Sequence, residues 1–165
     1  MKNKIPMAST VFGLGNELMS MDALATNGIV TCYGWYNDLG TPASDAFVKG
    51  MQEKYGAGVT DLGELDSATY EGIMIWAEGV KKAGAVEQQK VIAALETGIV
   101  IEGPSGKVTM DPKTHHTIRN AYLAQPADRK WQIMATYPDQ YPADTGGACD
   151  LMKNPTTDKQ FEPSI

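Results

Sequence analysis

The sequence contains few of the residues from which metal sites and disulfide frameworks are built, with two cysteines and two histidines among 165 residues. The histidines, His115 and His116, are adjacent. Neighbouring side chains on a strand point to opposite faces, so these two rings would not share one metal ion there. No apolar run approaches the roughly 20 residues that a membrane-spanning helix needs. We therefore expect neither a metal site nor a helical membrane protein.

Positive charge is also scarce. Lysine and arginine number 14 against 20 aspartates and glutamates, which gives a net charge of -6. A phosphate backbone would be repelled by this balance, so nucleic acid is not an expected partner. Apolar residues make up 42% and charged residues 21% of the chain, as in ordinary soluble globular proteins. The length suits one domain or a part of a two-domain protein.

The N-terminal segment has some features of a targeting signal. Two lysines precede a mildly apolar run over 5–14, and residues 23–25 resemble a small-x-small cleavage site. Proline, serine, threonine and glycine break this run, and acidic residues follow it. We therefore favour a short buried strand over 5–9 and a small helix over about 16–24.

Three helices are predicted in the next part of the chain, after a β-branched and aromatic strand over 29–36. The first has Thr41 as N-cap and Pro42 at its first position, and it stops at Gly56. The second runs from Asp66 or Ser67 to about residue 83, and the third covers 86–97. Their predicted apolar faces carry Ile73, Trp76, Ala77 and Val80 on the second helix and Val91, Ile92 and Leu95 on the third.

After residue 98 the period of the apolar residues changes from 3.6 to 2. Strands over 99–102 and 107–110 flank a four-residue Gly-Pro-Ser-Gly turn. Two more strands, over 116–124 and 131–137, are joined by a polar connection, and a Pro- and Gly-rich tail follows. The result is a mixed α/β chain whose sheet is incomplete, because three helices need more sheet than this to cover.

No motif of a cofactor site or a nucleophile fits. The Gly13-Leu14-Gly15 segment lacks the third glycine of a dinucleotide loop, and Ser105 lies in a hairpin turn rather than a nucleophile elbow. Cys32 is expected to pack within its strand, and a Cys32–Cys149 disulfide in an oxidising compartment stays open. We expect no catalytic residue and no cofactor.

One polar cluster could bind a small ligand. Ser9 and Thr10 close the first strand, Tyr33 lies in the second, and Ser67 and Tyr70 lie at the start of a helix. Hydroxyls at strand ends and helix N-termini suit small polar ligands, and aromatic rings add apolar walls. The alternative is that the aromatic residues pack only in a core or a hinge.

The segment over 103–117, Gly-Pro-Ser-Gly-Lys-Val-Thr-Met-Asp-Pro-Lys-Thr-His-His-Thr, closely resembles the C-terminal part of type I periplasmic solute-binding proteins of ABC transporters. The nearest branch holds receptors for urea and short-chain amides and, more broadly, branched-chain amino-acid binders such as the Leu/Ile/Val-binding proteins. Segments 4–9, 28–33, 45–56, 68–76 and 149–155 agree with the family in order.

The resemblance implies part of a two-lobed clam-shell (Venus-flytrap) fold, because family members are considerably longer. Residues 1–40 would finish the C-terminal lobe, and 41–98 would be helical cover of the N-terminal lobe. Residues 99–137 would return across the hinge as antiparallel strands, and 138–165 would form the tail. Such a C-terminal fragment would expose apolar helix faces and self-associate.

The resemblance also implies a function: a periplasmic substrate-binding component of an ABC uptake system, with a signal peptide in the missing N-terminal part. Its partners would be the membrane permease subunits and a small solute bound between the lobes. Ser9 and Thr10 match the family's cleft-facing loop, where a carboxylate sometimes holds an ammonium group, and Ser67 or Tyr70 matches a helix start near the ligand. Hydroxyls in that loop favour urea or a short-chain amide over a branched-chain amino acid. The alternative is a regulatory module of the same fold that senses amides or amino acids.

Overall fold

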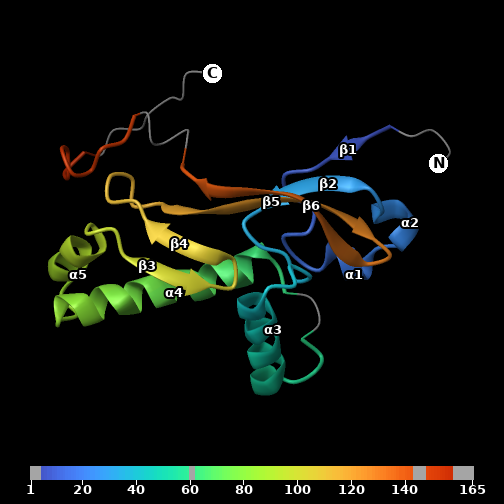
Figure 1. Ribbon diagram of the computed structural model, residues 1–165, viewed down its shortest axis with the longest axis horizontal. Coiled ribbons are helices and arrows are strands. Elements are labelled where there is room, and N and C mark those ends of the chain that lie inside the picture. Colours follow the sequence, from blue (N-terminus) through green and yellow to red (C-terminus); the bar gives the residue numbers. More distant parts are fainter. Residues whose placement is uncertain (1–4, 60–61, 143–147, 158–165) are drawn as a thin grey trace.

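The computed structural model describes residues 5–59, 62–142 and 148–157 (Figure 1). Six strands form one open sheet in the order β1-β2-β5-β4-β3, and β6 pairs with β5. None of the helices among these residues is long and apolar enough to cross a membrane. The elements are β1 (Met7–Ala8), α1 (Glu17–Ser20), α2 (Ala23–Thr26), β2 (Ile29–Tyr33), α3 (Pro42–Tyr55), α4 (Glu64–Ala83), α5 (Gln88–Leu95), β3 (Val100–Gly103), β4 (Gly106–Met110), β5 (Thr117–Ala127) and β6 (Lys130–Gln140).

The predicted helix that begins after Thr41 is confirmed because its end signals are local. The Thr41 hydroxyl accepts a hydrogen bond from the Ser44 N–H, and Pro42 stands at the first helical position of α3. Gly56 follows with a φ of 99°, which favours glycine. The next helix, α4, starts slightly earlier than predicted, at Glu64.

The small helix predicted over 16–24 is split into α1 and α2. Met21 is extended, with φ -95° and ψ 164°, and ends the first helix. The Asp22 carboxylate then accepts a hydrogen bond from the Leu24 N–H at 2.8 Å and caps the second helix. The preceding strand, predicted over 5–9, is only the two-residue β1.

Both hairpins turn more tightly than predicted. Gly103 pairs with Gly106, so the predicted four-residue turn is a two-residue loop. The polar connection predicted over 125–130 is wrong, because β5 runs to Ala127 and β6 begins at Lys130. Asp128 and Arg129 form the loop between them with φ values of 51° and 63°, as a type I′ turn requires.

The long strand β5 joins the two ends of the sheet. It pairs with β4 at Thr117 and Ile118, with β2 over 122–124, and with β6 along most of its length. Helices α4 and α5 lie beneath β3 and β4, and α1 and α2 lie near the other end (Figure 1). Among the described residues the hydrophobic core is divided into an aromatic cluster, an aliphatic cluster and a third cluster of Trp35, Phe47 and Leu62 beside α3. The aromatic cluster is Leu18, Tyr36, Tyr122, Ala124 and Trp131, and the aliphatic cluster is Ile75, Ile99, Ile101 and Val108.

The face of α4 that packs on the protein differs from the predicted apolar face. Ile73 and Trp76 are 61% and 52% exposed. The buried residues are Ser67, Glu71, Ile75 and Gly79. At Gly79 the helix approaches α5 so closely that an added Cβ would lie 2.9 Å from Leu95. On α5, Val91 is buried as predicted, together with Ala94.

Cys32 and Cys149 are both free thiols, so the disulfide left open above is not formed. Cys32 lies exposed on β2, where its backbone pairs with Leu123. The Cys149 thiol instead contacts the Lys113 carbonyl at 3.9 Å, in the segment that leads into β5.

Candidate functional site

The loop after β1 holds the first group of predicted ligand contacts. The Ser9 hydroxyl accepts hydrogen bonds from the N–H groups of Val11 (3.2 Å) and Phe12 (3.0 Å). The Phe12 carbonyl in turn accepts a hydrogen bond from the Tyr33 hydroxyl at 3.0 Å. The structure thus brings Ser9 and Tyr33 together through Phe12, and the neighbouring Thr10 side chain is exposed to solvent.

Tyr33 is half-buried, and burial raises the pKa of its phenol above 10.0. The negative charges of Glu17 and Glu64 raise this pKa further. The phenol therefore stays protonated at neutral pH and acts as a hydrogen-bond donor. Its proton is directed to the Phe12 carbonyl, so Tyr33 fixes the loop rather than presenting a free hydroxyl.

The second group of predicted contacts, on α4, lies differently. Ser67 is fully buried and donates to the Glu64 carbonyl at 2.9 Å, within its own helix. Tyr70 is 43% exposed, and its ring centroid lies 5.1 Å from that of Phe47 on α3. The structure shows no hydrogen bond or ring contact between these two residues and the loop after β1, within the part of the chain that it describes.

The two groups nevertheless lie on segments that touch. Gly63 precedes α4, and a Cβ added there would lie 2.5 Å from the Leu14 carbonyl oxygen. The loop after β1 therefore runs directly against the start of α4. This close approach needs a glycine, because the neighbouring atom belongs to the backbone and cannot move aside cheaply.

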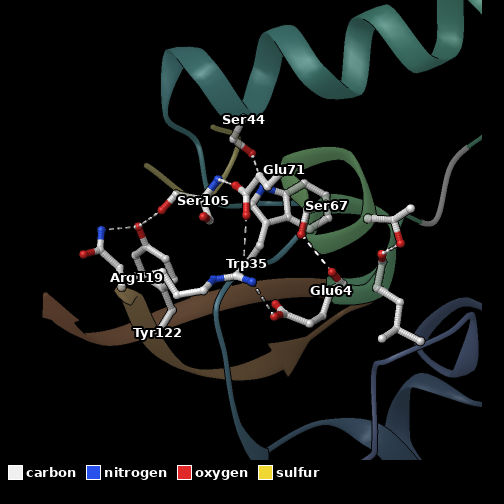
Figure 2. A network of polar contacts seen from close by, with 11 residues as sticks. Trp35, Ser44, Glu64, Ser67, Glu71, Ser105, Arg119 and Tyr122 are labelled. Carbon is white, nitrogen blue, oxygen red and sulfur yellow. Dashed lines mark hydrogen bonds and ion pairs between the residues drawn. The ribbon is translucent and has the colours of Figure 1, made fainter. Parts of the chain in front are cut away.

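A buried charge cluster, which the sequence predictions did not include, joins the first half of α4 to β5. The Arg119 guanidinium lies between two carboxylates, with Nη1 3.3 Å from Glu64 Oε1 and Nη2 3.6 Å from Glu71 Oε2 (Figure 2). The Glu71 side chain is only 3% exposed. Gly34 makes room for the guanidinium, because an added Cβ would lie 2.3 Å from Nη2.

The same cluster reaches the hairpin of β3 and β4. Glu71 Oε1 accepts a hydrogen bond from the Ser105 N–H at 2.8 Å, and the Tyr122 hydroxyl donates to the Ser105 carbonyl at 3.0 Å (Figure 2). An added Cβ on Gly103 would lie 2.5 Å from Glu71 Oε1. These contacts connect α4, the hairpin and β5.

The protonation of Glu64 is the property that this arrangement changes. Burial raises the pKa of its carboxyl above 4.5, and the negative charge of Glu71 adds to that effect. Arg119 and the backbone N–H groups of Trp35 and Gly34 act in the opposite direction, yet the net shift is upward. A sequence signal for the cluster does exist. Glu64, Ser67 and Glu71 follow helical spacing on the face that also holds Ile75.

A groove of about 450 Å³ lies elsewhere, between α5 and the C-terminal segment. His115 and Glu96 line it and pair at 3.0 Å. The described residues contain no group of three or more potential ligands that could hold a metal ion. The groove includes none of the predicted ligand contacts.

Comparison with known proteins identifies the fold. A family model described as periplasmic binding protein matches residues 1–130. The structure is similar to a solute-binding protein of an ABC transporter from Rhodopseudomonas palustris HaA2, solved with p-hydroxybenzoic acid. The TM-score is 0.70 at 24% identity, over 83% of this chain and 38% of that one.

Two further solved structures agree. The leucine-binding protein LivK from Thermotoga maritima MSB8 gives a TM-score of 0.58 at 19% identity, over 73% of this chain and 33% of that one. An amino-acid ABC transporter substrate-binding protein from Pseudomonas fluorescens Pf-5 gives 0.67 at 20% identity, over 84% and 38%.

A sequence comparison with curated proteins found no match. The chain spans well under half the length of the solved structures named above. The mixed α/β fold with its open sheet corresponds to part of the type I periplasmic binding fold. The family model covers most of the chain, and the chain therefore belongs to the periplasmic binding protein family, a family of substrate-binding proteins rather than enzymes.

Proposed function

We propose that the chain forms the C-terminal part of the substrate-binding component of an ABC uptake transporter. The family match over residues 1–130 is the observation that carries this proposal. In such a receptor the solute binds between two lobes, and the closed form is presented to the membrane permease subunits. Residues 1–40 would complete the C-terminal lobe, 41–98 and 99–137 would belong to the N-terminal lobe and the hinge, and a signal peptide upstream would direct the receptor to the periplasm.

The proposed ligand wall of the C-terminal lobe is the loop after β1. Ser9 accepts two backbone hydrogen bonds with its oxygen, which leaves its hydroxyl proton to donate to a solute carbonyl. Thr10 is exposed beside it and can both donate and accept. Tyr33 holds this loop in place by donating a hydrogen bond from its hydroxyl to the Phe12 carbonyl.

The start of α4 provides the opposite wall in this proposal. Tyr70 is the accessible hydroxyl there, since Ser67 is buried and donates to its own helix. Ser67 as a ligand contact stays a prediction that requires α4 to shift in the closed receptor. An uncharged set of hydroxyls matches urea or a short-chain amide better than the ammonium group of a branched-chain amino acid.

Isothermal titration of the receptor that contains this chain tests the solute class. We expect urea or acetamide to bind more tightly than L-leucine and 4-hydroxybenzoate. L-leucine and 4-hydroxybenzoate are included because structurally similar proteins are named for binding leucine or were solved with p-hydroxybenzoic acid. Tight binding of L-leucine without binding of urea or acetamide would overturn the amide assignment while leaving the receptor function intact.

Two variants test the site itself. Thr10→Ala and Tyr70→Phe each remove one exposed hydroxyl. We expect each variant to lower the affinity for the solute by about two- to tenfold. The matched controls are Thr136→Ala on β6 and Tyr55→Phe at the end of α3, because both side chains are exposed and lie outside the proposed walls. Equal losses in the controls would show that the walls are placed wrongly.

A further inference from the structure

The chain passes between the two ends of the sheet at 34–41 and again at 119–121. The first passage leads from β2, at the aromatic end, to α3, which contacts β3 at the aliphatic end. The second passage lies within β5, which pairs with β4 at Thr117 and Ile118 and with β2 over 122–124. The residues between these pairings therefore connect the two ends.

The second passage is irregular. The register of β5 against β6 shifts between Arg119 and Ala121. Asp139 on β6 has a φ of 49° there, and its N–H donates to the Asn120 side-chain oxygen at 3.3 Å. A shift of this kind bends a strand locally and changes the direction in which a side chain points. The irregularity thus lies where β5 leaves one end of the sheet for the other.

Arg119 lies at this irregularity and contacts both the other passage and α4. Its guanidinium lies against Gly34, the first residue of the first passage, where an added Cβ would overlap with it. The same group faces Glu64 and Glu71 in the first half of α4 (Figure 2). Helix α4 contributes Ile75 to the aliphatic cluster, so one side chain joins both passages to the aliphatic end.

The contacts of Arg119 are longer than those of a locked ion pair. Its distances to Glu64 and Glu71 are 3.3 Å and 3.6 Å, against about 2.7–2.9 Å for a charge-assisted hydrogen bond. Among the described residues, Arg119 Nε, Glu64 Oε2 and Glu71 Oε2 are buried without a hydrogen-bond partner. Such unused donors and acceptors offer a second set of contacts when α4 and β5 shift against each other. The cluster therefore suits two arrangements of the helix and the strand rather than one.

The start of α4 is also one wall of the proposed solute site. Tyr70 lies on it, and Gly63 approaches the Leu14 carbonyl in the loop after β1, which forms the opposite wall. A shift of α4 against β5 therefore changes the distance between the two walls.

We propose that Arg119 is a positioning residue that sets the angle between the two lobes, and so the affinity for the solute, without contacting the solute itself. The inference rests on the proposed two-lobed receptor. Its physical basis is the planar guanidinium, which faces two carboxylates and a backbone segment at once. Without these contacts the lobes populate further angles, and the affinity falls with the fraction of receptor left in the binding-competent state.

Double electron–electron resonance on the receptor that contains this chain measures the angle without a solute. Spin labels are attached at Leu24→Cys on α2 and at Val86→Cys between α4 and α5. These two side chains are 88% and 75% exposed and lie at opposite ends of the sheet. Cys32, Cys149 and any further cysteine are replaced by serine. The distribution of label-to-label distances then reports the populations of the lobe angles.

Two mild variants disturb the cluster. Arg119→Lys keeps the positive charge but cannot face two carboxylates with one planar group, and Glu71→Gln keeps the shape and removes a charge. Each should raise a second distance population to about 10% or more. Each should also lower the affinity by about two- to tenfold for whichever of urea, acetamide, L-leucine and 4-hydroxybenzoate the wild type binds. Thermal melts by circular dichroism should confirm that both variants stay folded.

The chain offers a matched control for each variant. Arg129→Lys changes an arginine whose side chain makes one long hydrogen bond, of 3.4 Å, to the Met21 carbonyl. Glu78→Gln changes a glutamate on the same helix as Glu71, with a side chain that is 38% exposed and pairs with Lys81. Neither control should alter the distance distribution or the affinity.

Unchanged distances in both variants would overturn the inference and leave Arg119 a purely stabilising role. A loss of affinity without a change in distance would also overturn it, because Arg119 would then contact the solute. Equal changes in the controls would show that the lobe angle does not depend on this cluster. A wild-type receptor that binds none of the four solutes, with distances that respond to Arg119→Lys, would instead contradict the proposed solute binding and support the positioning role.

Discussion

The two ends of the sheet hold different kinds of core. Around β2, β5 and β6 the core is aromatic. The Tyr36 and Trp131 rings lie 4.8 Å apart, and polar atoms fix their positions. The Tyr36 hydroxyl shares a hydrogen bond of 2.7 Å with Thr31, and the backbone N–H of Trp131 donates to the Asp38 carboxylate at 2.9 Å. Around β3 and β4 the core is aliphatic, and its contacts have no preferred direction.

The two kinds of core differ in how strictly they fix the positions of their members. A hydroxyl group needs a specific partner when it is buried, so Tyr36 fits the aromatic end in one arrangement. The aliphatic end buries Ile75 on one side of α4 and leaves Ile73 and Trp76 exposed on another. The Arg119 cluster connects the two ends, because it joins β5 to both α4 and the β3–β4 hairpin.

The largest expected effect comes from breaking the aromatic end. Trp131→Ala removes a ring that packs on Tyr36 and Phe12 and leaves a cavity, at a cost of about 4 kcal/mol in the free energy of unfolding. Urea denaturation measures the loss. The control is Tyr137→Ala on the same strand, whose ring is 47% exposed and whose removal should cost less than about 1 kcal/mol. Similar losses for both variants would show that the aromatic cluster is not a cooperative core.

The sequence predicts well those elements whose signals are local. For α3, Thr41, Pro42 and Gly56 mark both ends, and no distant residue is needed. The turn at Asp128 and Arg129 was missed because neither residue is a glycine or an asparagine, and the positive φ values come from the pairing of two long strands. Alternation of apolar residues does not reveal where such a strand ends.

The candidate site was predictable in part, and distance along the chain sets the limit. The turn at Ser9 follows from a hydroxyl three residues before Phe12. Arg119 lies far from Glu64 and Glu71 in sequence, so only the fold brings them together. For α4, the exposed face carries more large apolar residues than the buried face, so helical periodicity alone predicts the wrong face.

Breaking the connection between the two ends should have the next largest effect. Arg119→Met leaves two buried carboxylates without their cation, which should cost about 3 kcal/mol in the free energy of unfolding. Urea denaturation measures this loss, and adding Glu71→Gln to the variant should recover part of it. Arg129→Met is the control, since that exposed side chain makes one long hydrogen bond, of 3.4 Å, to the Met21 carbonyl. No recovery in the double variant would mean that Arg119 acts through packing and not through charge.

The smallest expected effect is the contribution of Glu64 to the pH dependence of the free energy of unfolding. Because the pKa of Glu64 is raised above 4.5 in the folded chain, the folded state binds a proton more readily than the unfolded state. Stability contributed by this group is therefore present below pH 4.5 and is lost as the pH rises through the folded pKa. Glu64→Gln cannot titrate, so its stability should fall less than that of the wild type over this window. Urea denaturation at a series of pH values compares the two slopes. Equal slopes would show that Arg119 and the backbone N–H groups of Gly34 and Trp35 fully offset the effect of burial on the pKa of Glu64. The stability contributed by the Arg119 cluster would then be independent of pH.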